Sequence, residues 1–218
     1  MSLMQGTVEQ KQRNDLAAYY HAQLEKSKLA KEYIKRMRYS KAVVHTFGIG
    51  YAPKSEYSRL ANRVIFPLRD IHGDVQALQG RKLSPADEGP KYWHTPYDKS
   101  RHLYGFYEYM QEGEHTPLLV CEGPKCPLAL AEIGVPAVAL FGTSISIKQL
   151  WLLATNQKTI YDALDNDEAG MKASLILQRL CAEHGLKYKN AKAPHPYKAW
   201  SDAYEVLTTD EFYRLYTS

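Results

Sequence analysis

Two hydrophobic patterns divide the chain near its middle. In the first half, residues 9–47 repeat apolar side chains at intervals of three and four positions, which predicts helices. Residues 63–69 and 74–79 predict two strands around the turn at 70–73, and residues 82–102 predict irregular structure because prolines and glycines interrupt them. Basic side chains fill the remaining faces of the predicted helices.

In the second half, short apolar runs alternate with helical patterns. Strands are predicted at 117–123, 135–142, 158–165 and 186–191, and helices at 127–133, 146–155 and 167–184. This alternation predicts βαβ units and a parallel sheet. Residues 200–216 predict two further helices.

The predicted fold class is therefore α/β, with a mixed α/β N-terminal subdomain followed by a parallel sheet with flanking helices. The hydrophobic pattern changes from Pro117 onward, and the segment QEGEH at 111–115 is the predicted boundary. We expect an N-terminal subdomain at 1–111, a sheet domain at 112–195 and a helical tail at 196–218.

Composition excludes several classes of protein. Of the 218 residues, 44% are hydrophobic and 24% are charged, which excludes a disordered or fibrous chain. No apolar run approaches the roughly 18 residues of a membrane span, and the polar N-terminus does not resemble a secretory signal. Three cysteines cannot form a disulfide framework, which favours a reducing, cytoplasmic location.

Charge is distributed unevenly between the two halves. Residues 1–111 hold 18 Lys and Arg against 11 Asp and Glu, whereas residues 112–218 hold 10 against 13. A basic half joined to an acidic half suggests a polyanion-binding surface beside a cation-binding site. Charge alone favours the simpler alternative of two ordinary solvated surfaces.

Acidic residues follow two of the predicted strands. Glu122 ends the first strand of the predicted parallel sheet, and Asp165 and Asp167 follow the third in the segment LDNDEAG. In such sheets ligands gather at the carboxyl ends of the strands, where paired carboxylates suit a hard cation such as Mg²⁺. Asp167 could instead cap the following helix. Glu122 in the same sheet favours the metal site.

This pairing of Glu-Gly with a later Asp-x-Asp resembles the TOPRIM domain of primases, topoisomerases and nucleases. Further segments resemble the catalytic core of DnaG-type primases, in order and over roughly residues 16–175. These are GIGYAP (48–53), NRVIFPLRDIHGDVQALQGRKL (62–83), GPKYWHTP (89–96), DKSRHLYG (98–105), LFGTSIS (140–146) and LDNDEAGMKA (164–173). The resemblance implies a TOPRIM-like sheet in the second half.

The resemblance also implies an activity, which is template-directed synthesis of short RNA primers on single-stranded DNA by metal-dependent nucleotidyl transfer. Glu122, Asp165 and Asp167 are the implied catalytic residues. They would bind Mg²⁺ or Mn²⁺ together with Asp202, and Glu122 would act either as a ligand or as a general base. The expected partners are the single-stranded DNA template, NTPs, a replicative helicase and a separate zinc-binding domain.

Basic and aromatic side chains of the first half are the candidates for binding nucleic acid and NTPs, because cations hold phosphates and rings stack on bases. They are Arg63, Arg69, Arg81, Lys91, Tyr92, Lys99 and Arg101. By resemblance, Arg63, Lys91 and Lys99 fall on basic positions of the family. For any one of these residues the alternative is a solvated charge or a buried ring.

The chain departs from the family pattern at two acids. The motif EGxxD reads EGPKC here, so Cys126 stands where an acid is usual. In KAWSD (198–202), Asp202 is kept but Ala199 stands where related phage and plasmid enzymes carry Asp. These changes leave a second metal position, and full activity, in question.

No cysteine and histidine set has the spacing of the family's zinc domain, so no zinc is expected in this chain. The chain is expected to be either an excised core or a compact primase-like protein of a phage or mobile element. Two other functions stay open: another TOPRIM phosphotransfer enzyme such as a nuclease, and a catalytically weakened nucleic-acid-binding module.

Overall fold

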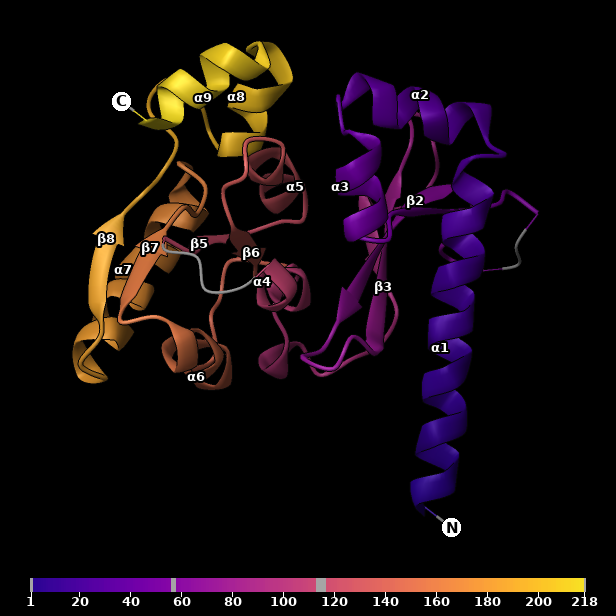
Figure 1. Ribbon diagram of the computed structural model, residues 1–218, viewed down its shortest axis with the longest axis horizontal. Coiled ribbons are helices and arrows are strands. Elements are labelled where there is room, and N and C mark those ends of the chain that lie inside the picture. Colours follow the sequence, from indigo (N-terminus) through magenta and orange to yellow (C-terminus); the bar gives the residue numbers. More distant parts are fainter. Residues whose placement is uncertain (1, 56–57, 113–116, 218) are drawn as a thin grey trace. The chain divides into compact units, whose positions relative to one another are not determined.

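The computed structural model describes residues 2–55, 58–112 and 117–217. The chain divides into two compact units, Met1–Tyr97 and Asp98–Ser218 (Figure 1). The first unit consists of helices α1 (Ser2–Leu24), α2 (Lys28–Arg36) and α3 (Lys41–Thr46), followed by strands β1 (Gly50–Ala52), β2 (Arg63–Arg69), β3 (Val75–Lys82) and β4 (Tyr92–His94). These strands form an antiparallel sheet in the order β1-β2-β3-β4.

Helix α1 packs against this sheet. Ala17 and Tyr20 of α1 join Ile65 and Leu78 of the sheet in one buried cluster. A side chain at Gly50 in β1 would come within 2.7 Å of the α1 backbone, so the absence of a Cβ there permits the close approach.

Pro67 lies inside β2, although proline is rare in the interior of a sheet. Strand β1 pairs only with residues 63–65 of β2, so Pro67 falls where one edge of β2 is open. A residue without a backbone N–H is tolerated at such an edge. The predicted strand over 63–69 therefore forms with the predicted limits.

The second unit begins with a 3₁₀ turn, η1 (Lys99–Arg101), and contains a parallel sheet in the order β6-β5-β7-β8. Its strands are β5 (Leu119–Cys121), β6 (Ala137–Ala139), β7 (Thr159–Asp162) and β8 (Lys187–Asn190). Its helices are α4 (Phe106–Glu112), α5 (Lys125–Ala131), α6 (Ile147–Asn156), α7 (Glu168–Glu183), α8 (Trp200–Val206) and α9 (Thr209–Thr217). The α/β class and the parallel sheet are confirmed.

The chain reverses direction across this sheet between its two central strands. From β5 it moves outward to β6, then returns to the other side of β5 to form β7 and β8. The gap between the carboxyl ends of β5 and β7 is thus a topological switch point, where α/β sheets bind ligands.

The compact units divide at residues 97 and 98, ahead of the boundary predicted at 111–115. The reason is packing, because Leu103, Phe106 and Tyr109 belong to the buried core of the second unit. Residues 113–115 of the predicted boundary lie outside the described residues. The tail at 196–218 also belongs to the second unit.

Short elements account for the other differences from the sequence prediction. Strand β4 and the turn η1 lie within the segment predicted to be irregular, and β1 and α4 were not predicted. Among the described residues, no helix combines the length and the apolar character needed to cross a membrane.

Candidate functional site

Two of the predicted acidic residues meet at the switch point of the second unit. Glu122 directly follows β5, and Asp165 lies three positions beyond the last residue of β7. The Oε1 atom of Glu122 accepts a hydrogen bond of 3.2 Å from the backbone N–H of Asp165. The two loops are therefore joined at the edge where the strand pattern places a ligand site.

Asp167 begins helix α7. Its Oδ1 atom accepts a hydrogen bond of 2.9 Å from the backbone N–H of Gly170, as expected for a helix N-cap. Its other oxygen, Oδ2, lies 2.8 Å from Nζ of Lys198. Asp167 thus caps α7 with one carboxylate oxygen and binds the cation of Lys198 with the other, so the two roles do not exclude each other.

Lys198 places a positive charge between the two aspartates. Its Nζ atom lies 3.0 Å from Asp165 Oδ2 and 2.8 Å from Asp167 Oδ2. These hydrogen bonds raise the pKa of Lys198, and the one with Asp167 is the main reason why the pKa of Asp167 is lowered. We call Glu122, Asp165 and Asp167 the carboxylate cluster, and two of its three members already hold a cationic group between them.

Burial makes two members of the carboxylate cluster, Glu122 and Asp165, costly to ionise. It raises the pKa of Glu122, and the charge of Asp165 raises it further. Burial also raises the pKa of Asp165, although hydrogen bonding to Lys198 opposes the shift. Since desolvated and mutually repelling carboxylates are stabilised by a nearby cation, the electrostatics favour cation binding here.

The donor chemistry fits a magnesium-like ion. Among the described residues, no three His, Cys, Asp or Glu side chains already converge in metal-binding geometry. Mg²⁺, however, usually takes only one or two protein carboxylates and fills its remaining positions with water and phosphate. Asp165 and Asp167 supply such a pair, and both lie against the single cation of Lys198.

Asp202 lies in the first turn of α8. Its charge raises the pKa of Asp165, so the two carboxylates interact electrostatically. Ala199 is the N-cap of α8 and makes no side-chain capping bond. The acid that the resemblance implies for related enzymes at position 199 would add both a carboxylate and a cap to this helix.

Cys126 is 5% exposed and packs with the buried thiol of Cys121. Its neighbour Lys125 forms an ion pair with Glu205, which connects α5 to α8. The side chain at the position where the family usually has an acid is therefore in the protein interior.

Two residues that the sequence did not mark lock the Asp165 loop in place. Lys192 donates hydrogen bonds to the backbone oxygens of Leu164, at 2.9 Å, and of Asp165, at 3.1 Å. The side-chain amide of Asn166 donates to the backbone oxygen of Tyr197 at 2.9 Å. The loop after β7 and the segment before α8 thus hold each other, which brings Lys198 to the aspartates.

A hollow of about 850 Å³ is lined by Asp167 of the carboxylate cluster and by Lys198. Its other lining residues include Ser174, Gln178, Tyr188, Asn190, Lys192 and His195. Hydroxyl, amide and cationic groups of this kind can bind a polar ligand.

Lys99 lies near the same strand ends. Its Nζ atom lies against Gly142, where φ is +152° and where an added side chain would collide with it. The N–H of Gly142 in turn donates a hydrogen bond of 3.1 Å to the backbone oxygen of Glu122. The buried side chain of Gln149 donates to the backbone oxygens of Lys99 and His102 and so fixes this turn. Gln149 is a positioning residue that the sequence did not reveal.

In the first unit, a basic and aromatic cluster forms on β3 and β4. The guanidinium of Arg81 lies 5.3 Å from the ring centre of Tyr92 and 5.9 Å from that of Tyr33. The ammonium of Lys91 lies 5.8 Å from the Tyr92 ring. Three of the predicted residues for binding nucleic acid, Arg81, Lys91 and Tyr92, are therefore neighbours.

Arg63 has a different environment. It is 5% exposed, and its guanidinium donates to the backbone oxygens of Arg59 at 3.0 Å and Pro90 at 2.9 Å. Burial lowers its pKa. These contacts anchor two loops to β2, and the predicted contact of Arg63 with nucleic acid stays a prediction.

The last two predicted basic residues are Arg69 of the first unit and Arg101 of the second. Arg69 ends β2 and packs against Gly48, with a long contact of 3.4 Å to the backbone oxygen of Thr46. Arg101 is exposed and forms an ion pair of 2.9 Å with Asp98.

Comparison with known proteins gives two family matches along the chain. Residues 54–110 match the family described as the DNA primase catalytic core, N-terminal domain, and residues 119–204 match the Toprim-like family. The DNA primase of Haemophilus influenzae is 32% identical over 197 residues, which cover 73% of this chain and 33% of that protein.

The chain belongs to the DnaG-type primase family. It spans about a third of the length of the primases that it matches. Metal dependence is general among TOPRIM primases.

Solved structures agree with this membership. The structure of the DnaG catalytic core has a TM-score of 0.81 at 25% identity, covering 93% of this chain and 77% of that one. The structure of the DnaG primase catalytic domain bound to ssDNA also has a TM-score of 0.81, at 24% identity, covering 96% and 82%. The fold predicted from the motifs is thus the fold of the family.

Proposed function

We propose that this chain is the catalytic core of a DNA primase, which joins ribonucleotides on a single-stranded DNA template. The observation that carries the proposal is the carboxylate cluster at the switch point of a TOPRIM-family sheet, whose two aspartates hold a cationic group between them. Nucleotidyl transfer needs such a site, because charge develops on phosphate oxygens as the bond to the leaving group breaks.

We assign Asp165 and Asp167 to hold Mg²⁺ or Mn²⁺, with Asp202 nearby. Such an ion, when bound, supplies Lewis-acid stabilisation of the charge on the phosphates. Asp167 is already oriented by its capping bond to Gly170, and the loop of Asp165 is held by Lys192. Both carboxylates are thus preorganised before substrate arrives.

In the reaction, the 3′-oxygen of the primer forms a bond to the α-phosphorus of the incoming NTP. The bond from that phosphorus to the bridging oxygen breaks, and pyrophosphate leaves with the electron pair. We assign Glu122 to receive the proton of the 3′-hydroxyl, because burial and the charge of Asp165 raise the pKa of this carboxyl group.

Template and NTP binding are assigned to the basic residues. Arg81, Lys91 and Tyr92 combine cationic groups with a ring, the combination that holds an unpaired strand. Lys99 lies beside the Glu122 loop and suits an NTP phosphate. A primase relative has been solved with ssDNA. A separate zinc-binding domain and a replicative helicase are further proposed partners.

A template-dependent primer assay tests the proposal. Single-stranded DNA, labelled NTPs and Mg²⁺ or Mn²⁺ should yield short oligoribonucleotides, and omission of template or metal should abolish them. The assay is repeated with a primase zinc-binding domain added in trans. Absence of product under both conditions, or DNA cleavage that needs no NTP, would contradict the proposal.

Lys198→Met is expected to tighten metal binding. The lysine pairs with both aspartates, so an incoming ion must displace it. Because exposed ion pairs contribute modestly, the dissociation constant for Mn²⁺ should fall about threefold to tenfold. Calorimetric titration measures the change.

Lys172→Met is the matched control for that titration. Among the ion pairs of the described residues, Lys172 pairs only with Glu168, on the surface of α7. Its affinity for Mn²⁺ should equal that of the wild type. Unchanged or weaker binding by the Lys198 variant would show that the lysine does not compete with metal.

A further inference from the structure

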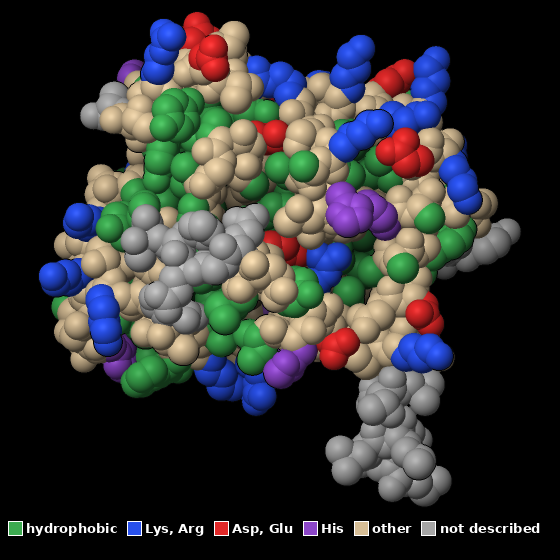
Figure 2. Space-filling model, in the orientation of Figure 1, with side chains coloured by type: hydrophobic (Ala, Val, Ile, Leu, Met, Phe, Trp, Pro, Cys, Tyr) green, Lys and Arg blue, Asp and Glu red, His purple; other side chains and the backbone are tan. Residues whose placement is uncertain are grey.

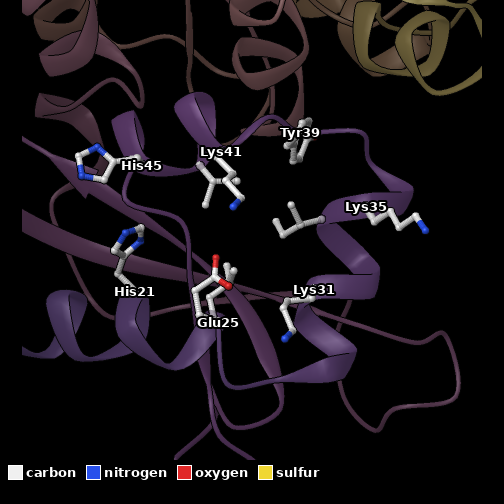
Figure 3. Close-up of a pocket in the computed structure, with 10 residues that line it drawn as sticks. His21, Glu25, Lys31, Lys35, Tyr39, Lys41 and His45 are labelled. Carbon is white, nitrogen blue, oxygen red and sulfur yellow. The ribbon is translucent and has the colours of Figure 1, made fainter.

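A second hollow lies entirely within the first unit, among helices α1, α2 and α3 (Figure 3). Its volume is about 550 Å³. Its lining residues are His21, Leu24, Glu25, Lys31, Ile34, Lys35, Tyr39, Lys41, Val44 and His45. None of them belongs to the carboxylate cluster or to the residues predicted to bind nucleic acid, so the proposed function leaves this hollow unexplained.

The rim of the hollow is basic. Lys31 and Lys35 are one helical turn apart on α2, and Lys41 and His45 are one turn apart on α3. All four are exposed. Figure 2 shows Lys and Arg side chains gathered over the region of these two helices. Glu25 is the one acidic residue of the lining.

The floor of the hollow is apolar and mainly aliphatic. Leu24, Tyr39 and Val44 are buried, and Ile34 is half-buried. Nucleic-acid bases favour aromatic platforms, and the one ring of the floor, that of Tyr39, belongs to a residue that is only 7% exposed. An aliphatic floor instead suits a branched or aromatic side chain of a peptide.

We propose that this hollow binds a short acidic peptide segment of a partner protein that carries a bulky apolar side chain. The apolar side chain fills the floor between Leu24 and Ile34, and the flanking carboxylates pair with Lys31, Lys35 and Lys41. Charge complementarity at the rim speeds the encounter and excludes basic segments, while the floor supplies the apolar contact.

Glu25 affects how strongly the hollow prefers acidic over basic ligands. In Figure 3 its carboxylate and the ammonium of Lys41 point toward one another across the hollow. An acidic peptide must approach Lys41 in the presence of this negative charge. Removing the charge by Glu25→Gln should therefore tighten peptide binding, whereas it should weaken the binding of a basic ligand.

The test measures fluorescence anisotropy of a labelled peptide that alternates Asp with Leu and Phe, titrated with the full chain near physiological salt. Lys35→Glu and Lys41→Glu should each weaken binding about threefold to tenfold, the range expected for exposed charge pairs. Glu25→Gln should strengthen it by a similar factor. A peptide with Ser in place of Asp, and one with Ala in place of Leu and Phe, should bind poorly.

Lys28→Glu is the matched control, because Lys28 is an exposed lysine of α2 outside the hollow and pairs with Glu32 at its surface. It changes net charge as much as the other reversals but leaves every lining residue of the hollow in place. The proposal would be overturned if Lys28→Glu lost as much peptide affinity as the other reversals, or if the wild type showed no saturable binding. It would also be overturned if an oligonucleotide displaced the peptide and the Lys35 and Lys41 variants no longer bound that oligonucleotide. Failure of primer synthesis alone would not affect it.

Discussion

Asp165→Asn should lower the rate of template-directed primer synthesis on the order of 10³-fold, the cost of removing a preorganised charge from a reacting centre. Asparagine keeps the shape of the side chain but loses the charge that pairs with Lys198 at 3.0 Å and that we assign to metal binding. The same variant should bind Mn²⁺ measurably more weakly in a calorimetric titration. Steady-state primer yield and metal affinity are the two measurements.

Unfolding should not explain that loss. Burial raises the pKa of Asp165 in the folded state, so the folded state binds the proton more tightly than the unfolded chain does. Ionised Asp165 therefore costs stability once the pH exceeds its unfolded pKa, and neutral Asn removes that cost at neutral pH. Without metal, Asp165→Asn should be no less stable than the wild type in thermal unfolding.

Asp210→Asn serves as the control for charge, because Asp210 is an exposed acid in the first turn of α9. Like Asp165→Asn, it removes one negative charge, but at a position outside the carboxylate cluster. It should therefore leave primer yield unchanged. A folded Asp165→Asn protein with primer yield within tenfold of the wild type would mean that another residue holds the metal.

Part of the carboxylate cluster could be predicted from the rule that ligands bind at the carboxyl ends of parallel strands. Apolar runs located β5 and β7, and parallel strands bring their carboxyl ends to one edge, so Glu122 and Asp165 were expected to meet. The same rule could not reveal Lys198. It reaches the aspartates because Asn166 and Lys192 fasten two segments together, and such long-range hydrogen bonds leave no periodic pattern.

Burial of charge was also hidden from the sequence. Arg63 was predicted to contact nucleic acid from its basic surroundings and the family resemblance, and neither indicates that its guanidinium is enclosed by backbone oxygens of two loops. Short strands could not be predicted from the sequence for another reason. A strand of three residues such as β1 cannot show alternation, and its place in the sheet follows from pairing with β2.

The second large effect is expected at Gly170, in the first turn of α7. A Cβ at this position would collide with the backbone oxygen of Asp165 and would lie 2.6 Å from Oε1 of Glu122. Helix propensity alone would make Gly170→Ala stabilising by about 1 kcal/mol. Overpacking costs about 1–3 kcal/mol, and here the obstacle includes backbone, which cannot rotate away. We therefore expect net destabilisation in urea unfolding.

Activity should suffer more than stability in Gly170→Ala. The two atoms that the new methyl group displaces belong to the loop of Asp165 and to the carboxylate of Glu122, so relief of the clash separates the groups assigned to metal and proton. Misplacement by about 1 Å can cost on the order of 10²-fold in rate. Gly123→Ala is the steric control for stability, because a Cβ there meets nothing within 4 Å. If Gly170→Ala matched Gly123→Ala in urea unfolding and kept wild-type Mn²⁺ affinity, α7 would be free to move without disturbing the cluster. The close packing of helix and carboxylates would then have no part in organising the site.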